Sequence, residues 1–520
     1  MMTVADAGLY RCHRAVREHE GIFSIHGTWL PMLLFGSMGA ITWAIRGSNG
    51  WGGIDGTIVP GLTWGLLWYY LCRRKGIDAR SIVLWLGMGI AIGGELGYGQ
   101  YASWLRGNFS YRDEILPVSP WTGCAWFVIC GIGWGAPGGI LLGWALNSRV
   151  PVRSWLVRTL LFLALLVFIF NLGAPLLGPG AVESLGTWFR QHCPWPIFPY
   201  GETGLYSGEL DEHLARTVYT NTQNVAVLVW WLVAMAAAAA QRDRATLVSG
   251  AVVGAGFGLG FVVSALWCLG YGLAPGYIDW WKMWELHAGV NLGILYVIVL
   301  NWGIREVDRT HAPDGTPYAF SKSPLPGEGI ISGFLALSGF VLVFAAGYEY
   351  FFWTGLCLAA FYAVTVCLAH GSPGKVLSQN QISQRRRSMA LAYSAFLLVF
   401  MLLHGGTSRL GVILELYSPD AVDQYEWPSG RVWLMIAGSA ILLVVTLTCI
   451  RKMLRQPNIP LYPDAGAGRL SARMADLCTA IGIVGAASIW PEKTAILYAV
   501  CICLAIFAFN RINIRIADID

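Results

Sequence analysis

A cluster of aromatic and ionisable residues stands directly before a long apolar run near the middle of the chain. The segment DWWKMWELHAG, from Asp279 to Gly289, holds three tryptophans, two carboxylates, a lysine and a histidine in eleven residues. Flat rings beside carboxylates suit a polar ligand with apolar C–H faces, and sugars are the commonest such ligand. Glu285 is therefore the first candidate for acid/base chemistry.

On a helix, the side chains of this segment divide between two neighbouring stripes. One stripe contains residues spaced four, three and four apart, namely Trp280, Trp284, His287 and Asn291. The other contains Trp281, Glu285 and Gly289. On a regular helix Glu285 and His287 point about 200° apart, so one narrow cavity cannot take both.

The second candidate carboxylate is Glu95, in the glycine-rich run LGMGIAIGGELGYGQY. Small residues recur every four positions around it, at Gly89, Gly93 and Gly97. Such a stripe lets a second helix approach closely. A carboxylate about one turn inside a bilayer costs a few kcal/mol unless it is paired or faces water, so it is a functional candidate. An ion pair with Arg46 or Arg106 is the structural alternative.

The residues expected to hold a substrate lie in three segments, AIRGSNGWGGIDG, GYGQYASWLRG and DWWKMWELHAG. They are Arg46, Asn49, Trp51, Asp55, Tyr98, Gln100, Trp104, Trp281, Trp284 and His287. The first segment has five glycines between positions 47 and 56, which permit tight turns and close approach of the backbone to a ligand. No lysine follows these glycines, so a phosphate-binding loop is not expected.

Two carboxylates can act at a glycosidic bond as general acid and as nucleophile or base. Their separation would report the stereochemistry, at about 5–5.5 Å for retention and about 6.5–9.5 Å for inversion. Glu95 and Glu285 are the predicted catalytic pair. The sequence contains no HExxH or CxxC motif, so no metal or other cofactor is expected.

The composition places these residues in a membrane protein. Of 520 residues, 56% are hydrophobic and only 12% are charged, with a mean hydropathy of +0.55, which is too much apolar surface for one soluble core. Apolar runs long enough to cross a bilayer as helices recur from end to end. The predicted fold is an all-α polytopic bundle of about fourteen spans, approximately 28–45, 54–72, 81–98, 121–146, 154–178, 222–240, 246–270, 283–303, 329–346, 349–369, 389–404, 430–450, 471–490 and 492–510.

The basic residues predict the orientation of these spans. If the N-terminus is cytoplasmic, 26 of the 35 Lys and Arg residues fall on the inside and 9 on the outside, and this bias sets topology. Both termini are then cytoplasmic, and the aromatic-rich loops face outward. The charged N-terminal stretch RCHRAVREHEG does not resemble a cleaved signal peptide. A plasma or inner membrane is expected.

The chain is expected to divide into two transmembrane halves. The predicted parts are a cytoplasmic segment 1–27, a first half 28–303 of about eight spans with external loops, a cytoplasmic linker 304–328, a second half 329–510 of about six spans, and a cytoplasmic tail 511–520. The sequence specifies no oligomeric state.

Polarity along the spans separates two classes of function. The cytoplasmic halves, such as LTWGLLWYYL, are almost purely apolar, which favours a site open only to the outside. The leading hypothesis is a multi-pass membrane enzyme that acts on a carbohydrate or glycan by hydrolysis or glycosyl transfer. A secondary transporter of a sugar or another polar solute, with Glu95 or Glu285 carrying a coupling proton, is the alternative. Membrane lipid is the other expected partner, whereas no basic patch with interleaved aromatics indicates nucleic acid.

Overall fold

A computed structural model describes residues 28–48, 54–71, 79–111, 114–147, 150, 152–169, 212–309 and 492–517, with the isolated positions 440 and 444. These residues are mostly helical. The predicted segment 1–27, most of the linker 304–328 and the five predicted spans between 329 and 490 lie outside this description, apart from the two isolated positions.

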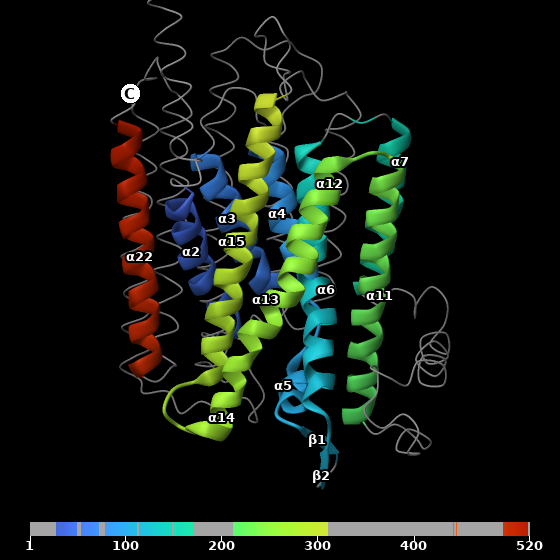
Figure 1. Ribbon diagram of the computed structural model, residues 1–520, viewed down its shortest axis with the longest axis vertical. Coiled ribbons are helices and arrows are strands. Elements are labelled where there is room, and N and C mark those ends of the chain that lie inside the picture. The colour runs from blue at the N-terminus through green and yellow to red at the C-terminus, as the bar shows by residue number, and fades with distance from the viewer. Residues whose placement is uncertain are drawn as a thin grey trace, which may run out of the picture.

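Long helices run along the longest axis of the molecule, with short elements between them (Figure 1). In chain order the elements are α2 (Trp29–Ser48), α3 (Ile54–Leu71), α4 (Ala79–Gly93), α5 (Gly99–Leu105), β1 (Asn108–Tyr111), β2 (Glu114–Pro117), α6 (Pro120–Leu146), α7 (Val152–Ile169), α11 (Glu212–Ala240), α12 (Arg244–Ser249), the π-helix η1 (Gly250–Ala255), α13 (Gly256–Ala265), the 3-10 helix η2 (Leu266–Leu269), α14 (Gly270–Leu273), α15 (Trp280–Arg309) and α22 (Glu492–Ala517).

Four helices in the described part of the chain are long and apolar enough to cross a membrane. They are Pro120–Leu146, Thr220–Ala240, Arg244–Leu273 and Trp280–Gly303. Two shorter apolar helices, Trp29–Ala44 and Ile496–Ile512, accompany them. The predicted helical, membrane-type fold is therefore confirmed in this coarse form. The count of fourteen spans and the location of the termini stay predictions.

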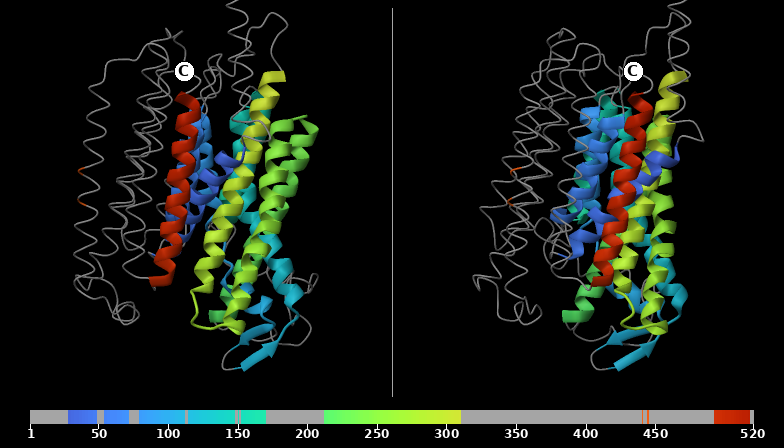
Figure 2. Two further views of the ribbon diagram at one scale, coloured as in Figure 1. Left: turned by 60° about the vertical axis from the view of Figure 1, so that its left-hand side comes forward. Right: turned by 90° about the vertical axis from the view of Figure 1, so that its left-hand side faces the viewer.

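α6 is the central helix of the described bundle, and glycines let its neighbours approach closely. A stripe with a spacing of four, Gly131, Gly135, Gly139 and Gly143, faces α12, η1 and α13. A Cβ atom at Gly135 would lie 2.5 Å from the carbonyl oxygen of Val253, so no larger residue fits there. α6 carries no charged residue and shares its apolar surface with protein on several sides (Figure 2).

The glycine stripe predicted on α4 packs against α6. A Cβ atom at Gly93 would lie 2.5 Å from the carbonyl oxygen of Trp134, and one at Gly89 would lie 2.7 Å from the Cα of Gly138. The expectation that this stripe admits a second helix is confirmed. Because Gly89 pairs with the later residue of α6, the two helices are antiparallel.

α2 and α15 also cross in close contact and run antiparallel. A Cβ atom at Gly39 would lie 2.4 Å from the carbonyl oxygen of Gly289. Near one end of the pair Lys282 contacts Ala44, and near the other Asn301 contacts Thr28. The helices therefore alternate in direction through this part of the bundle.

Because neighbouring helices alternate in direction, the connections between them lie at the two ends of the molecule. The basic end, named for Arg153, Arg242 and Arg244, holds the start of α7 and the turn between α11 and α12. The hairpin end holds α14 and the antiparallel strands β1 and β2 (Figure 1), which pair from Asn108 with Pro117 to Tyr111 with Glu114. This hairpin is a local departure from the all-α prediction.

Candidate functional site

The helix predicted to carry Glu95 is broken. The sequence predicted a continuous span from residue 81 to 98, but α4 ends at Gly93 and α5 begins at Gly99. Between them the Leu96 amide donates to the carbonyl oxygen of Gly93 at 3.3 Å, and the chain turns away from the helix axis. Glu95 therefore lies on a turn and not on a helix face. We call residues Gly94–Tyr98 the break.

Contacts from neighbouring helices hold the break in place. On α3, the Oγ1 atom of Thr57 would lie 2.1 Å from a Cβ atom at Gly94, so only glycine fits there. On α6, the indole nitrogen of Trp134 donates to the carbonyl oxygen of Leu96 at 3.0 Å. These tertiary contacts supply partners for backbone groups that a continuous helix would have paired internally.

The break lies at the middle depth of α6. Gly97 accepts a hydrogen bond from the Sγ atom of Cys130 at 3.6 Å, and Gly93 packs on Trp134. At 1.5 Å per residue, these two α6 residues lie roughly 15 and 21 Å from the start of that helix. Non-helical backbone at such a depth is tolerated only where it is buried in protein or lines a water-filled cavity.

An aromatic cluster joins the break to α15. The ring of Tyr98 stacks on Trp281 with centroids 5.8 Å apart and meets Trp284 edge-on at 4.8 Å. Trp284 also contacts Phe127 of α6 and Phe261 of α13, at 5.3 and 5.2 Å. The structure thus brings together three of the residues expected to hold a substrate. Tyr98 and Trp281 are half-buried, whereas Trp284 is fully buried.

The other candidate carboxylate, Glu285, belongs to a buried ion pair within α15. The side chains of Lys282 and Glu285 are 1% and 2% exposed, and the ammonium group of Lys282 donates to Oε2 of Glu285. The same ammonium group lies 3.2 Å from the carbonyl oxygen of Ala44, and Trp281 Nε1 donates to Oε1 of Glu285 at 3.2 Å. Both oxygens of this carboxylate are therefore engaged by protein groups.

Glu95 differs from Glu285 in its surroundings. Its side chain is exposed although its neighbours Gly94 and Leu96 are buried. A chain of contacts through Tyr98 and Trp281 connects the break, where Glu95 lies, with the carboxylate of Glu285. The two predicted carboxylates are thus connected through the break and one aromatic pair.

The other predicted residues take different positions. Nδ1 of His287 accepts from Nε1 of Trp267 at 3.1 Å, on a different side of α15 from Glu285, as helical spacing predicted. Trp104 is buried against Tyr101, Phe109 and Trp126 rather than against the aromatic pair. The side chains of Arg46 and Asp55, and the whole of Asn49 and Trp51, lie outside the described residues.

Sequence reasoning missed a polar stretch on α11. The run TNTQN, residues 220–224, places Asn221 and Asn224 in the core, where both are 0% exposed. Asn224 Nδ2 lies 3.0 Å from the carbonyl oxygen of Gly97 in the break, and predicted Gln100 contacts Asn221 at 3.4 Å. Five consecutive polar residues beside an apolar span were the signal that could have identified this site.

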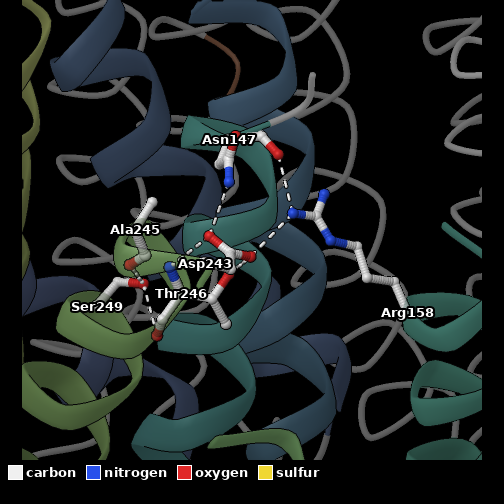
Figure 3. A network of polar contacts seen from close by, with 6 residues as sticks. All are labelled: Asn147, Arg158, Asp243, Ala245, Thr246 and Ser249. Carbon is white, nitrogen blue, oxygen red and sulfur yellow. Dashed lines mark hydrogen bonds and ion pairs between the residues drawn. The ribbon is translucent and has the colours of Figure 1, made fainter. Parts of the chain in front are cut away.

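A second buried polar network lies at the basic end of the bundle (Figure 3). Arg158 Nη2 donates to Oδ2 of Asp243 and to the carbonyl oxygen of Asn147, both at 2.9 Å. Asp243 also accepts from Asn147 Nδ2 at 2.8 Å and from the hydroxyl of Thr246 at 2.5 Å. The network ties the end of α6 and the first half of α7 to the turn before α12, which contains Arg242 at φ 54°.

The candidate site and the Arg158–Asp243 network lie at different levels of the bundle. Near mid-depth and toward the hairpin end lie the break, the aromatic cluster and the Lys282–Glu285 pair, whereas the Arg158–Asp243 network lies at the opposite end. Such a site can bind a polar solute between rings and hydrogen-bonding groups. Comparisons of the chain with models of protein families, with curated proteins and with solved structures give no match, so the function rests on the geometry of this site.

Proposed function

We propose that this chain is a secondary transporter of a sugar or another polar solute. The observation that carries the proposal is the break between α4 and α5, which lies at mid-depth of the apolar helix α6. Transporters characteristically place their solute and ion sites near the bilayer midplane, on discontinuous helices whose freed backbone groups face the ligand.

The Lys282–Glu285 pair supports the same function. α15 is long and apolar enough to cross a membrane, and ionisable residues inside such a helix are costly and mark solute or ion pathways by default. A glycosidase carboxylate must touch its substrate directly. Glu285 is 2% exposed and bonded through both oxygens, which suits an occluded transport site better than an open catalytic one.

The aromatic pair gives the proposed solute its chemistry. Tyr98 and Trp281 are half-buried and stacked, and such rings present faces to the C–H surface of a sugar. Glu95 lies in the break, Gln100 follows it on α5, and both carry groups that can bond hydroxyls. A sugar or a similarly polyhydroxylated solute is therefore the proposed substrate class.

The two ends of the bundle suggest the direction of access. The Arg158–Asp243 network ties helices together at the basic end, and the positive-inside bias predicts that this end is cytoplasmic. We therefore propose that solute enters the site from the hairpin end. That end would face the extracytoplasmic side of a plasma or inner membrane.

A glycan-acting membrane enzyme is the second candidate, and the exposure of Glu95 favours it. In that case Glu95 would be the carboxylate that reaches the glycosidic bond, and Glu285 its partner across the aromatic pair. Glu285 would first have to release Lys282 and Trp281. This requirement makes hydrolysis or glycosyl transfer the less well supported reaction.

Uptake and hydrolysis can be separated in one preparation. The full chain in proteoliposomes is given a panel of radiolabelled sugars and, in parallel, a panel of glycosides. We expect uptake of at least one solute, reduced about tenfold or more in Glu285→Gln and unchanged in the control Glu114→Gln on β2. Release of reducing sugar without uptake, lost in both Glu95→Gln and Glu285→Gln, would establish the enzyme instead.

A further inference from the structure

A buried cluster of uncharged polar groups joins α5, α11 and the break. Tyr101 Oη donates to Oδ1 of Asn221 at 2.8 Å, and Nε2 of Gln100 lies 3.4 Å from the same oxygen. Tyr101, Asn221 and Asn224 are 0% exposed, whereas Gln100 is half-buried. The cluster therefore leads from a partly exposed amide into the core of the bundle.

The innermost member is Asn224. More oxygen atoms lie near its carboxamide nitrogen than that nitrogen can donate hydrogen bonds to. Its Nδ2 lies 3.0 Å from the carbonyl oxygen of Gly97, 3.1 Å from Tyr101 Oη and 3.0 Å from the carbonyl oxygen of Thr220. A carboxamide nitrogen has two hydrogens, so at least one of these oxygens receives no proton from it. The three oxygens surround one point at mid-depth of α6.

The other end of the same carboxamide is unsatisfied. Oδ1 of Asn224 is buried and has no hydrogen-bond partner among the described residues. Buried polar atoms are almost always paired, and an exception requires an explanation such as a bound ion or water. The cluster thus contains a buried oxygen acceptor, Oδ1 of Asn224, that no donor among the described residues satisfies, and a bound cation would supply the missing partner.

We propose that this cluster binds a monovalent alkali cation, Na⁺ or K⁺, and that this cation is the ion coupled to solute movement. The ligands would be Gly97 O, Tyr101 Oη, Thr220 O and Oδ1 of Asn224, after its carboxamide rotates about its terminal bond. Hard cations prefer oxygen ligands, and unwound carbonyls in broken membrane helices are typical sites for Na⁺. The coupling, though not the binding, rests on the proposed transport function.

The charges near the break fit a monovalent ion. The cluster itself contains no carboxylate, whereas divalent ions are usually bound by one or more carboxylates. Glu95 lies two residues before Gly97 and places one negative charge at the same turn. The proton predicted as coupling ion has a poor carrier in Glu285, because both of its oxygens are bonded and its side chain is 2% exposed.

Binding is tested on the purified full chain in detergent. Thermal unfolding is followed by tryptophan fluorescence in NaCl, KCl or choline chloride at equal concentration, so that screening is constant. A ligand of the native state raises the unfolding midpoint with saturation. We expect such a rise with Na⁺ or K⁺ relative to choline. Equal midpoints in all three salts would overturn the inference.

Single substitutions then show whether the cation-dependent rise in the unfolding midpoint depends on this cluster. Asn224→Ala and Asn221→Ala should abolish the cation-dependent rise, and Asn147→Ala, which removes the same type of side chain at the basic end, should retain it. Asn224→Asp keeps an oxygen ligand and adds a charge, so it should reduce the half-saturating concentration about tenfold. If Asn224→Ala does not fold, an unchanged half-saturating concentration in Asn224→Asp rejects the site.

Coupling is tested in proteoliposomes with an inward gradient of the effective cation or of protons. Uptake driven by the cation gradient supports the whole inference. Uptake driven only by the proton gradient, with no cation effect on the midpoint, leaves transport intact and overturns the cation site. A cation-dependent midpoint without uptake of any solute retains the site and removes the transport proposal.

Discussion

Tyr98 lies against Trp281 with their ring centroids 5.8 Å apart and an interplanar angle of 27°. One residue belongs to the break and the other to the first turn of α15, so this stacked pair is where the two parts of the candidate site meet. It also joins Glu95, on the same turn as Tyr98, to Glu285, which accepts from Trp281.

Removing one ring of this pair should weaken solute binding. An aromatic pair contributes about 0.5–1.5 kcal/mol beyond area burial, so Tyr98→Ala should raise the KM for uptake roughly 2- to 13-fold. Tyr98→Phe keeps the ring and should behave like the wild type. An unchanged KM in Tyr98→Ala would show that the aromatic pair is not part of the solute site.

Gly94 should tolerate no side chain. A Cβ atom there would lie 2.1 Å from Oγ1 and 2.4 Å from Cγ2 of Thr57, so Gly94→Ala should destabilise the protein by about 1–3 kcal/mol through overpacking. Gly99→Ala is the matched control, because nothing lies within 4 Å of its added Cβ atom. The unfolding midpoints of the two variants are measured by thermal unfolding in detergent. Equal midpoints would contradict the described packing of the break.

The Lys282–Glu285 pair should show opposite effects on stability and on transport. Lys282→Met leaves a buried carboxylate unpaired and should cost about 3–5 kcal/mol. The double variant Lys282→Met/Glu285→Leu removes both charges and should recover most of that loss, since an apolar pair can replace a buried ion pair. Uptake should remain absent in the double variant. Uptake by the double variant would show that the ion pair has only a structural role.

The Arg158–Asp243 network should control how firmly the basic end is closed. Asp243→Ala removes the acceptor of Arg158, of Asn147 and of the first turn of α12. We expect hydrogen exchange at α12 and at the start of α7 to become at least tenfold faster, because the opening free energy falls by more than about 1.4 kcal/mol. Protection at β1 and β2, at the far end, is the internal control and should not change.

The orientation of the bundle can be tested with epitope insertions. A tag placed in the turn between Gln241 and Asp243 should bind antibody only after the membrane is permeabilised, because the basic end is predicted to be cytoplasmic. A tag between β1 and β2 should bind without permeabilisation. The reverse pattern would invert the proposed direction of access.

The sequence predicted the apolar helices closely where their limits depend on local signals. The span predicted at 121–146 is α6, Pro120–Leu146, which has proline at its first position and a polar residue after its end. The span predicted at 81–98 ends five residues early, because a Gly-Gly pair can continue a helix or leave it. Tertiary contacts with Thr57 and Trp134 decide between these outcomes, and such contacts are not visible in a linear pattern.

The candidate site could be predicted only in part, because it too depends on tertiary contacts that a linear pattern does not show. Trp281 and Trp284 lie on the two neighbouring stripes predicted for α15, whereas the break brings Tyr98 against them, and residue type alone identified Glu285. Lys282 was overlooked although its spacing of three from Glu285 is typical of a helical ion pair. The amides of α11 were overlooked because an uncharged polar run next to an apolar one resembles the end of a span.

The burial of α6 has a consequence for how the protein assembles in the membrane. Its candidate span is 83% buried by the rest of the chain, yet the helices that cover its glycine stripe, η1 and α13, are synthesised more than a hundred residues later. During synthesis α6 must first be solvated by lipid on the surfaces that later meet protein. Completion of the bundle then displaces that lipid, so late folding steps should depend on lipid composition more strongly than insertion does.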